Sequence, residues 1–261
     1  MLLFIKLLIW GVLMKIIENI CYGTRSERDH LCDIYLPDDK KDFATFVYFH
    51  GGGITGGSKG GIQPFVQTLV DAGYAVVKAN YRLYFEASYP DFIDDAALCV
   101  SYIMNHIEEY GGNKEKIVVG GSSAGGYITM MLAFDNFFLA HYGISPNQIA
   151  GWVFDAGQPT THFNVLKERG IDNRAVIIDR AAPIFHIRQY SGLNPMIIFA
   201  ADNDMPGRLE QTHLMLNTLK RFGYPEENVT FEYMEGYSHC KYTGQQIFAD
   251  KVLAFMEAKV K

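Results

Sequence analysis

The sequence predicts an α/β fold, with about eight strands in a mostly parallel sheet and helices on both of its faces. Short β-branched and aromatic runs alternate with segments whose apolar residues recur at helical spacing, which is typical of such a sheet. The chain has 261 residues, 49% of them apolar, and no Pro/Ser-rich linker or internal repeat divides it. These observations favour one large domain with a sizeable core.

The expected elements can be placed from this alternation and from the turn residues between the runs. The expected strands span residues 16–21, 30–36, 43–49, 75–80, 117–120, 150–154, 196–200 and 229–234. The expected helices span about 63–72, 92–107, 124–133 and 208–222, and a last helix carries Ile247, Phe248, Val252, Leu253 and Met256 on one face. The first two strands look antiparallel, and the others suit parallel pairing.

Charge and cysteine content exclude several function classes. The formal net charge of −6 is spread along the chain without a basic run, which argues against nucleic acid as a partner. The four cysteines form no C-x-x-C pair and show no metal-ligand spacing. A chain of this size needs no disulfides, so we expect reduced thiols and a cytoplasmic location.

The first 14 residues are almost wholly apolar, interrupted by Lys6. This segment is shorter than the roughly 20 residues of a spanning helix, lacks a basic start and is followed by no A-x-A-like cleavage site, so no stable membrane span is expected. Three interpretations remain open: a segment that exports or membrane-anchors the chain, a peripheral helix packed on the domain, or sequence upstream of a start at Met14. The domain itself is expected to cover residues 15–261.

A Gly/Ser-rich turn at residues 120–126 joins an expected strand to an expected helix. It contains Gly-x-Ser-x-Gly with Ser123 at the centre. A serine on such a tight turn sits in strained backbone geometry with its hydroxyl pushed outward, and the helix start favours negative charge beside it. Ser123 is therefore the candidate nucleophile. The alternative is an ordinary glycine-rich turn.

A second glycine run, His50 to Gly53, directly follows the strand 43–49. Consecutive glycines can turn several N–H groups toward one point, as an oxyanion hole requires. The expected donors are the N–H groups of Gly52, Gly53 and Ala124. A phosphate cradle is excluded because the Gly-x-x-x-x-Gly-Lys-Ser/Thr pattern is absent, whereas a flexible loop remains the alternative.

The base and its orienting acid are expected after the last strands, in the order Ser, Asp, His. His239 comes just past the strand 229–234, and both Asp202 and Asp204 follow the strand 196–200. Asp204 lies two residues farther out, where the loop can turn back to His239, whereas Asp202 is placed to bind backbone N–H groups. His50 is expected to hold its loop rather than to act as the base.

These residues together predict acyl transfer. Ser123 would attack a carbonyl, His239 would take and return the proton, and Asp204 would fix the imidazole tautomer. Water would complete the second half-reaction, so no metal or organic cofactor is needed. H-E-x-x-H and dinucleotide-binding patterns are both absent from the sequence.

At this point the sequence resembles the α/β-hydrolases of the carboxylesterase and hormone-sensitive-lipase type, and their compact relatives of feruloyl or acetylxylan esterase type. The matching motifs are His50-Gly51-Gly52-Gly53 with Gly57-Ser58, Asn80-Tyr81-Arg82-Leu83 with Glu86, Tyr89-Pro90 and Asp95, Gly121-Ser122-Ser123-Ala124-Gly125-Gly126, Asp204 and His239. The resemblance covers nearly everything after about residue 24. It implies the α/β-hydrolase fold and a structural role for the Tyr-Arg-Leu segment.

The sequence also departs from the lipase pattern. Ser122 stands where those proteins usually have Asp, and Asp204 is followed by Met205-Pro206 rather than Pro-Leu. The resemblance implies a serine hydrolase acting on small to medium carboxylic esters. An amidase or peptidase, of arylformamidase or dipeptidyl-peptidase type, is the alternative within enzymes, and a non-catalytic binding module of the same fold is the alternative outside them.

Residues 155–190 show little regular patterning but contain Phe163, Val165, Leu166 and Ile184. Their position after an expected strand suggests a small lid or pocket insertion that lines the acyl or alcohol site. A packed connection is the equally weighted alternative. The sequence names no other substrate-binding residues.

Overall fold

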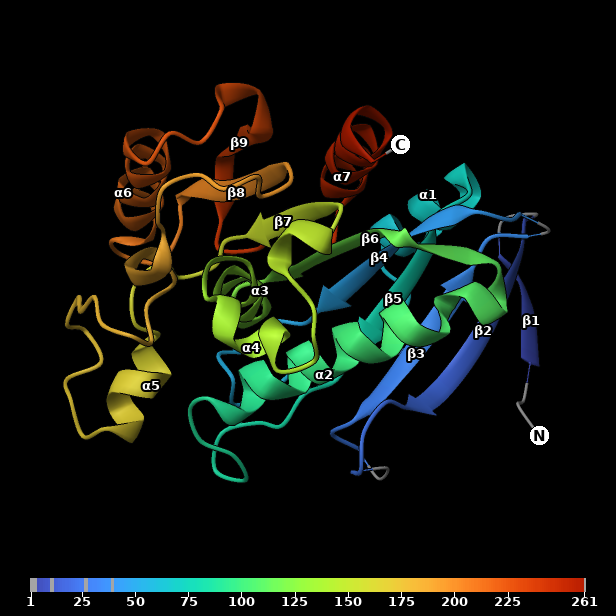
Figure 1. Cartoon of the computed structure of the whole chain (residues 1–261), viewed down its shortest axis with the longest axis horizontal. Coiled ribbons are helices and arrows are strands. Elements are labelled where there is room, and N and C mark those ends of the chain that lie inside the picture. Colours follow the sequence, from blue (N-terminus) through green and yellow to red (C-terminus); the bar gives the residue numbers. More distant parts are fainter. Residues whose placement is uncertain (1–3, 10–11, 26–27, 39, 261) are drawn as a thin grey trace.

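The computed structural model describes residues 4–9, 12–25, 28–38 and 40–260, with side chains from residue 14 onward. Within these residues, nine strands form one sheet in the order β1-β2-β3-β5-β4-β6-β7-β8-β9 (Figure 1). The strands are β1 (Phe4–Ile9), β2 (Val12–Cys21), β3 (Leu31–Leu36), β4 (Phe43–Phe49), β5 (Ala75–Ala79), β6 (Gly112–Ser122), β7 (Gly151–Asp155), β8 (Met196–Asn203) and β9 (Val229–Ser238). The α/β-hydrolase fold expected from the sequence is confirmed.

Following the order of strands in the sheet, the pairs β1–β2, β2–β3 and β3–β5 are antiparallel. All pairs from β5 through β4 to β9 are parallel. Parallel strands end at the same edge, so the turns after β4, β6, β8 and β9 come together there. Across β6 and β7, Ser122 is the register partner of Asp155. The sequence placed all candidate catalytic residues at this edge.

The first strand contradicts one interpretation of the apolar N-terminal segment, the peripheral helix, whereas export, anchoring and a start at Met14 stay predictions. Residues 4–9 pair antiparallel with β2, Phe4 opposite Ile17 and Ile9 opposite Val12. The prediction of a peripheral helix is therefore wrong. Residues 4–9 instead add a ninth strand, which is the outermost strand of the sheet beside β2. A continuous apolar run suits a helix and a strand equally, which is why periodicity could not choose between them.

Seven α-helices occur in the described part of the chain: α1 (Pro64–Ala72), α2 (Asp91–His106), α3 (Ala124–Phe134), α4 (Asn136–Ala140), α5 (Phe163–Glu168), α6 (Arg208–Arg221) and α7 (Gln246–Lys259). They cover both faces of the sheet, with α1 and α7 on one and α2, α3 and α6 on the other (Figure 1). Pro64 opens α1 and Gly73, in the left-handed region, ends it. The residues at its two ends thus determine where α1 begins and ends.

Strand β4 shows why the parallel strands are apolar throughout. Val47 and Phe49 belong to the core cluster beneath α2 and α3, whereas Phe46 and Tyr48 belong to the cluster beneath α1 and α7. Successive side chains point to opposite faces, and both faces are covered. The rigid sheet that results fixes the position of the turn that follows β4.

The segment 155–190 is more ordered than the sequence indicated. It contains α5 and a 3₁₀ turn, Pro183–His186. His162 is buried and accepts a hydrogen bond from the Asn164 N–H at 3.2 Å, which caps α5. Neither α4 nor α5 was predicted, because helices of five and six residues show too little apolar periodicity in the sequence.

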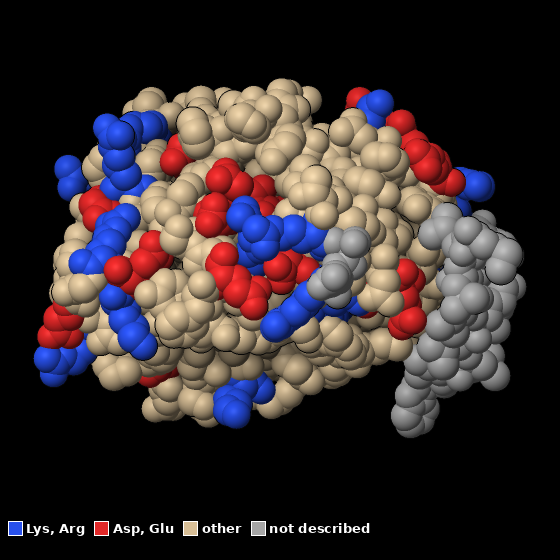
Figure 2. Space-filling view, turned by 90° about the horizontal axis from the view of Figure 1, so that it is seen from below, with Lys and Arg blue, Asp and Glu red and all other residues tan. Residues whose placement is uncertain are grey.

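On the face seen in Figure 2, acidic and basic side chains lie next to one another rather than separated by sign. Among the described residues, every helix is too short or too polar to cross a bilayer.

Candidate active site

Ser123 lies on the turn between β6 and α3, in a conformation that L-residues rarely adopt, with φ 54° and ψ −111°. The turn is tight: a Cβ added to Gly125 would lie 2.1 Å from the backbone oxygen of Phe49. Only glycine permits this approach of α3 to β4. The packing therefore holds the serine in strained geometry, with its side chain projecting from the sheet edge.

The structure brings Ser123, His239 and Asp204 together from three loops. The Ser123 hydroxyl lies 2.8 Å from Nε2 of His239, and Nδ1 of the same ring lies 2.6 Å from Oδ1 of Asp204. The side chain of Asp204 is 1% exposed and that of His239 is 23% exposed. A neutral imidazole that donates to the buried carboxylate through Nδ1–H leaves Nε2 free to accept the serine proton.

Asp202 lies at the end of β8 and Asp204 just after it, and the two aspartates have different partners. Asp202 accepts a hydrogen bond from the Gly236 N–H at 2.9 Å, and this bond lowers the pKa of its carboxyl group. Asp204 accepts a second hydrogen bond, from the Met205 N–H at 2.6 Å, in addition to that from His239. Asp202 thus ties the end of β8 to the last residues of β9, just before His239, while Asp204 contacts the imidazole itself.

The glycine loop after β4 lies against the nucleophile. A Cβ on Gly51 would lie 3.2 Å from Cβ of Ser123, and Gly52 and Gly53 have φ of 119° and 64°. Among the described residues, no hydrogen bond uses the N–H of Gly52, Gly53 or Ala124. These donors, with the N-terminal end of α3, can stabilise negative charge that develops beside Ser123.

Two aromatic rings and an amide hold the glycine loop. His50 stacks on Tyr81 with ring centroids 4.4 Å apart, and the Tyr81 hydroxyl donates to the His50 backbone oxygen at 2.8 Å. Asn164 of α5 donates to the backbone oxygen of Gly53. Burial lowers the pKa of His50 to about 4, so this imidazole is neutral at pH 7. These contacts give His50 a structural position and connect the segment 155–190 to the loop.

A buried carboxylate that the sequence did not indicate lies next to this site. Asp155, the last residue of β7, accepts hydrogen bonds from the Ser122, Tyr242 and Thr243 hydroxyl groups, the last two at 2.7 and 2.6 Å. Burial raises the pKa of Asp155, and the hydroxyl donors oppose this shift. The departure at Ser122, where lipases have Asp, was the one available signal. Its hydroxyl now binds a carboxylate supplied by the neighbouring strand.

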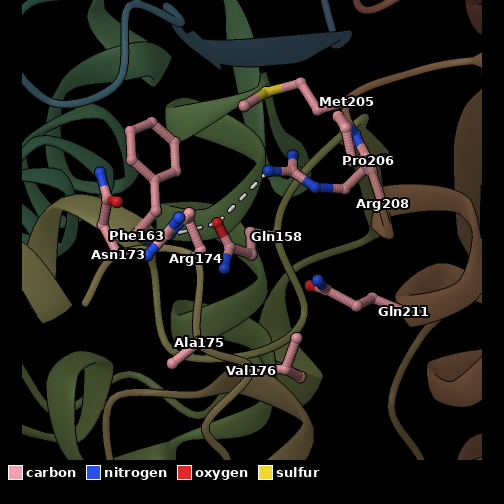
Figure 3. A pocket seen from close by; sticks show the side chains of 10 residues that line it. All are labelled: Gln158, Phe163, Asn173, Arg174, Ala175, Val176, Met205, Pro206, Arg208 and Gln211. Carbon is pink, nitrogen blue, oxygen red and sulfur yellow. Dashed lines mark hydrogen bonds between the residues drawn. The ribbon is translucent and has the colours of Figure 1, made fainter. Parts of the chain in front are cut away.

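A cavity of about 470 Å³ opens above Ser123 and His239. Phe163 and Met205 line it, and the same two residues line a second cavity of about 380 Å³ (Figure 3). The two cavities therefore adjoin. Within the described residues, His, Cys, Asp and Glu side chains form no cluster of three or more that could hold a metal ion.

A comparison with family models matches residues 32–157 to BD-FAE, a model of α/β-hydrolase type. The match begins in β3 and ends just after β7, so it includes the glycine loop, Ser123 and Asp155. His239 and Asp204 lie outside the matched residues.

Curated relatives match a similar part of the chain. A probable carboxylic ester hydrolase, LipM, from Mycobacterium tuberculosis is 32% identical over 118 residues, which cover 44% of this chain and 27% of LipM. The carboxylesterase NlhH from the same organism is 35% identical over 119 residues, 45% of this chain and 37% of NlhH. The matched segment thus spans about a third of the length of these relatives.

Solved structures resemble the whole chain at lower sequence identity. A truncated carbohydrate esterase from gut microbiota has a TM-score of 0.75 at 19% identity, over 94% of this chain and 96% of its own. The propionate-bound esterase Est2 from Thermogutta terrifontis has a TM-score of 0.69 at 22% identity, over 98% of this chain and 94% of its own. At these identities the likeness establishes the fold alone.

Proposed function

We propose that this chain, which has the α/β-hydrolase fold, is a serine hydrolase that cleaves small to medium carboxylic esters through an acyl-enzyme. The observation that carries the proposal is the continuous hydrogen-bonded path from the Ser123 hydroxyl through His239 to the buried carboxylate of Asp204. A nucleophile, a base within reach of it and an acid that orients the base form the arrangement that acyl transfer requires.

In the first half-reaction, the Ser123 hydroxyl passes its proton to Nε2 of His239 as its oxygen attacks the ester carbonyl. Asp204 holds the Nδ1 proton of the ring and stabilises the imidazolium that forms. His239 then gives the proton to the leaving alkoxide, which departs as the alcohol. A water molecule repeats these steps on the acyl-serine and releases the acid.

The carbonyl oxygen becomes negatively charged in each tetrahedral intermediate. The N–H groups of Gly52, Gly53 and Ala124 are the donors assigned to it, because each belongs to the wall around Ser123 and none is used elsewhere in the described structure. One donor of this kind typically lowers the barrier by about 2.7–4 kcal/mol.

The size of the substrate follows from the cavity and the named relatives. About 470 Å³ above Ser123 suits a short or medium acyl group with its alcohol, rather than a long acyl chain. LipM and NlhH are described as a carboxylic ester hydrolase and a carboxylesterase, which supports ester over amide cleavage.

The test is labelling with a fluorophosphonate followed by peptide mapping. We expect the label on Ser123, and its loss in Ser123→Ala and strong reduction in His239→Ala. Ser58→Ala, in the exposed loop before α1, is the matched control and should label as the native chain does.

A series of 4-nitrophenyl esters from acetate to dodecanoate then measures substrate size. We expect kcat/KM to be greatest among the shorter acyl chains. Labelling without hydrolysis of any ester would favour an amidase or peptidase, and the absence of both labelling and hydrolysis would refute the hydrolase assignment.

A further inference from the structure

Arg208, the first residue of α6, is a buried cation. It is 4% exposed, and burial lowers the pKa of its guanidinium group. One terminal nitrogen donates to the backbone oxygen of Ala156 at 2.5 Å, and the other donates to the Gln158 side-chain oxygen at 3.3 Å. Both acceptors are neutral. Among the described residues, no carboxylate forms an ion pair with this guanidinium, although the negative charge of the buried Asp204 acts on it from farther away and raises its pKa in part.

A buried charge without a counter-ion is costly, because desolvation is not offset by an opposite charge. A guanidinium offers five N–H donors, and Arg208 uses two of them within the protein. The arrangement is therefore incomplete in the free protein. An anion that enters beside Arg208 would supply a direct counter-ion, which Asp204 does not, and acceptors for the remaining donors.

Arg208 lines the second cavity, of about 380 Å³. Figure 3 shows its guanidinium reaching from α6 towards Gln158, with Phe163 and Met205 at one end of the cavity and Ala175 and Val176 at the other. The walls are thus mainly apolar, with the polar groups of Arg208, Gln158 and Gln211 among them. This combination is typical of a site that binds an organic molecule and orients it by one polar end.

The charge balance of the cavity indicates the kind of anion. Arg174 also lines it, but both oxygens of Asp172 accept hydrogen bonds from its guanidinium, so this cation is already neutralised. Arg208 is thus the cation of this cavity wall that has no direct ion-pair partner among the described residues, and it presents a planar fork of donors. A carboxylate matches it in charge and in geometry, whereas a phosphate dianion would leave one negative charge unpaired.

We propose that the cavity at Arg208 is a subsite for a carboxylate carried by the ester substrate. The inference rests on the proposed ester hydrolysis and narrows its substrate class to acidic esters. Phe163 and Met205 line both this cavity and the one above Ser123, and the proposed substrate extends past these two side chains from the reacting carbonyl to Arg208. The carboxylate belongs to either the acyl or the alcohol half, and the experiment below separates the two.

The experiment compares matched pairs of esters that differ only in charge. On the acyl side, the pair is 4-nitrophenyl hydrogen adipate and 4-nitrophenyl adipamate. On the alcohol side, it is 4-acetoxybenzoate and 4-acetoxybenzamide. We expect kcat/KM in one of the pairs to be about tenfold or more higher for the acid, since a hydrogen bond to a charged group is worth that much.

Arg208→Gln should bring this ratio close to one. Arg221→Gln, which removes an exposed arginine at the other end of α6, is the matched control and should keep the native ratio. Because the ratio is taken within one protein, a general loss of activity in Arg208→Gln cancels. If Arg208→Gln does not fold, the ratio of the native chain still tests the proposal, and Arg208→Lys tests the residue.

The two proposals fail in distinguishable ways. If neutral esters are cleaved but the native chain prefers the acid in neither pair, or if Arg208→Gln keeps the preference, the carboxylate subsite is wrong and the hydrolase stands. If no ester is cleaved, calorimetric binding of methyl hydrogen adipate and methyl adipamate to Ser123→Ala decides. Weaker or equal binding of the acid would overturn the subsite.

Discussion

The carboxylate of Asp155 and the hydroxyl of Thr243 lie 2.6 Å apart, although 88 positions separate them in the chain. Asp155 ends β7, beside the strand that carries the nucleophile, and Thr243 follows His239 by four residues. With the bonds from Ser122 and Tyr242, this contact joins the turn of Ser123 to the loop of His239. The distance between nucleophile and base thus depends on a residue outside the Ser-His-Asp set.

Asp155→Asn should lower kcat more than it raises KM. An amide keeps one acceptor but places a donor among hydroxyl groups, so the loop of His239 would shift, and misplacement by about 1 Å can cost roughly 10²-fold in rate. The free energy of unfolding should fall by about 1–3 kcal/mol. Steady-state kinetics and urea unfolding measure the two effects.

Asp250→Asn on the exposed side of α7 is the control and should change neither quantity. A folded Asp155→Asn protein with native kcat would show that Asp155 serves stability alone.

Asp202 at the end of β8 and Asp204 just after it allow a matched comparison. Asp204→Asn should lower kcat by a factor on the order of 10⁴, because an amide can donate to Nδ1 of His239 and so favours the wrong tautomer. Asp202→Asn should cost about tenfold or less, since Asp202 contacts only backbone and the side chain of Asn203. Initial rates with one nitrophenyl ester measure both, and the larger loss in Asp202→Asn would reverse the roles.

Gly52→Ala tests whether the glycine loop after β4 stabilises the oxyanion. Gly52 has φ 119°, and an added Cβ would lie 2.2 Å from the backbone oxygen of Gly56, so the loop must move. We expect kcat to fall about 10²- to 10³-fold, as for loss of one donor. Gly61→Ala is the control, because Gly61 also has positive φ but its added Cβ would meet nothing within 4 Å.

Circular dichroism must show that both glycine variants are folded. Similar kcat values for Gly52→Ala and Gly61→Ala would show that the glycine loop takes no part in the reaction.

The sequence predicted those parts of the fold and the site that depend on residues close together in the chain. The strand β4 and the glycine loop after it are continuous in the chain, so composition and order sufficed to place Gly52 and Gly53 beside Ser123. The order of loops along a parallel sheet then pointed to Asp204 and His239. Each of these inferences needed only a local pattern and the rule that parallel strands end at one edge.

Contacts between distant segments could not be predicted in this way. Asp155 appears in sequence as an ordinary residue after a strand, and its role depends on Thr243 and Tyr242, which no local pattern connects to it. Arg208 likewise appears as a helix-start residue, and only the fold buries it beside Gln158. The strand at residues 4–9 was missed because only its pairing with β2 distinguishes it from an apolar helix.

Buried histidines should make the protein sensitive to acid. Burial, reinforced by the positive charge of Arg208, lowers the pKa of His162 to about 3, from an ordinary value of 6.5. Below pH 6.5 the unfolded chain therefore binds a proton at this residue that the folded chain does not. The contribution of His162 to the free energy of unfolding is fully present above pH 6.5. It is lost as the pH falls towards 3, by about 1.4 kcal/mol per pH unit. His50 contributes with the same sign down to about pH 4.

His162→Asn isolates this contribution, because asparagine keeps an acceptor for the Asn164 N–H and so preserves the cap of α5. Urea unfolding at several pH values between about 6 and 4 should show the native chain losing stability more steeply than the variant, by about 1.4 kcal/mol per pH unit. His213→Asn, an exposed position on α6, should keep the native slope. If the native and His162→Asn profiles ran parallel, His162 would bind its proton equally in the folded and unfolded chains, and the prediction would be wrong.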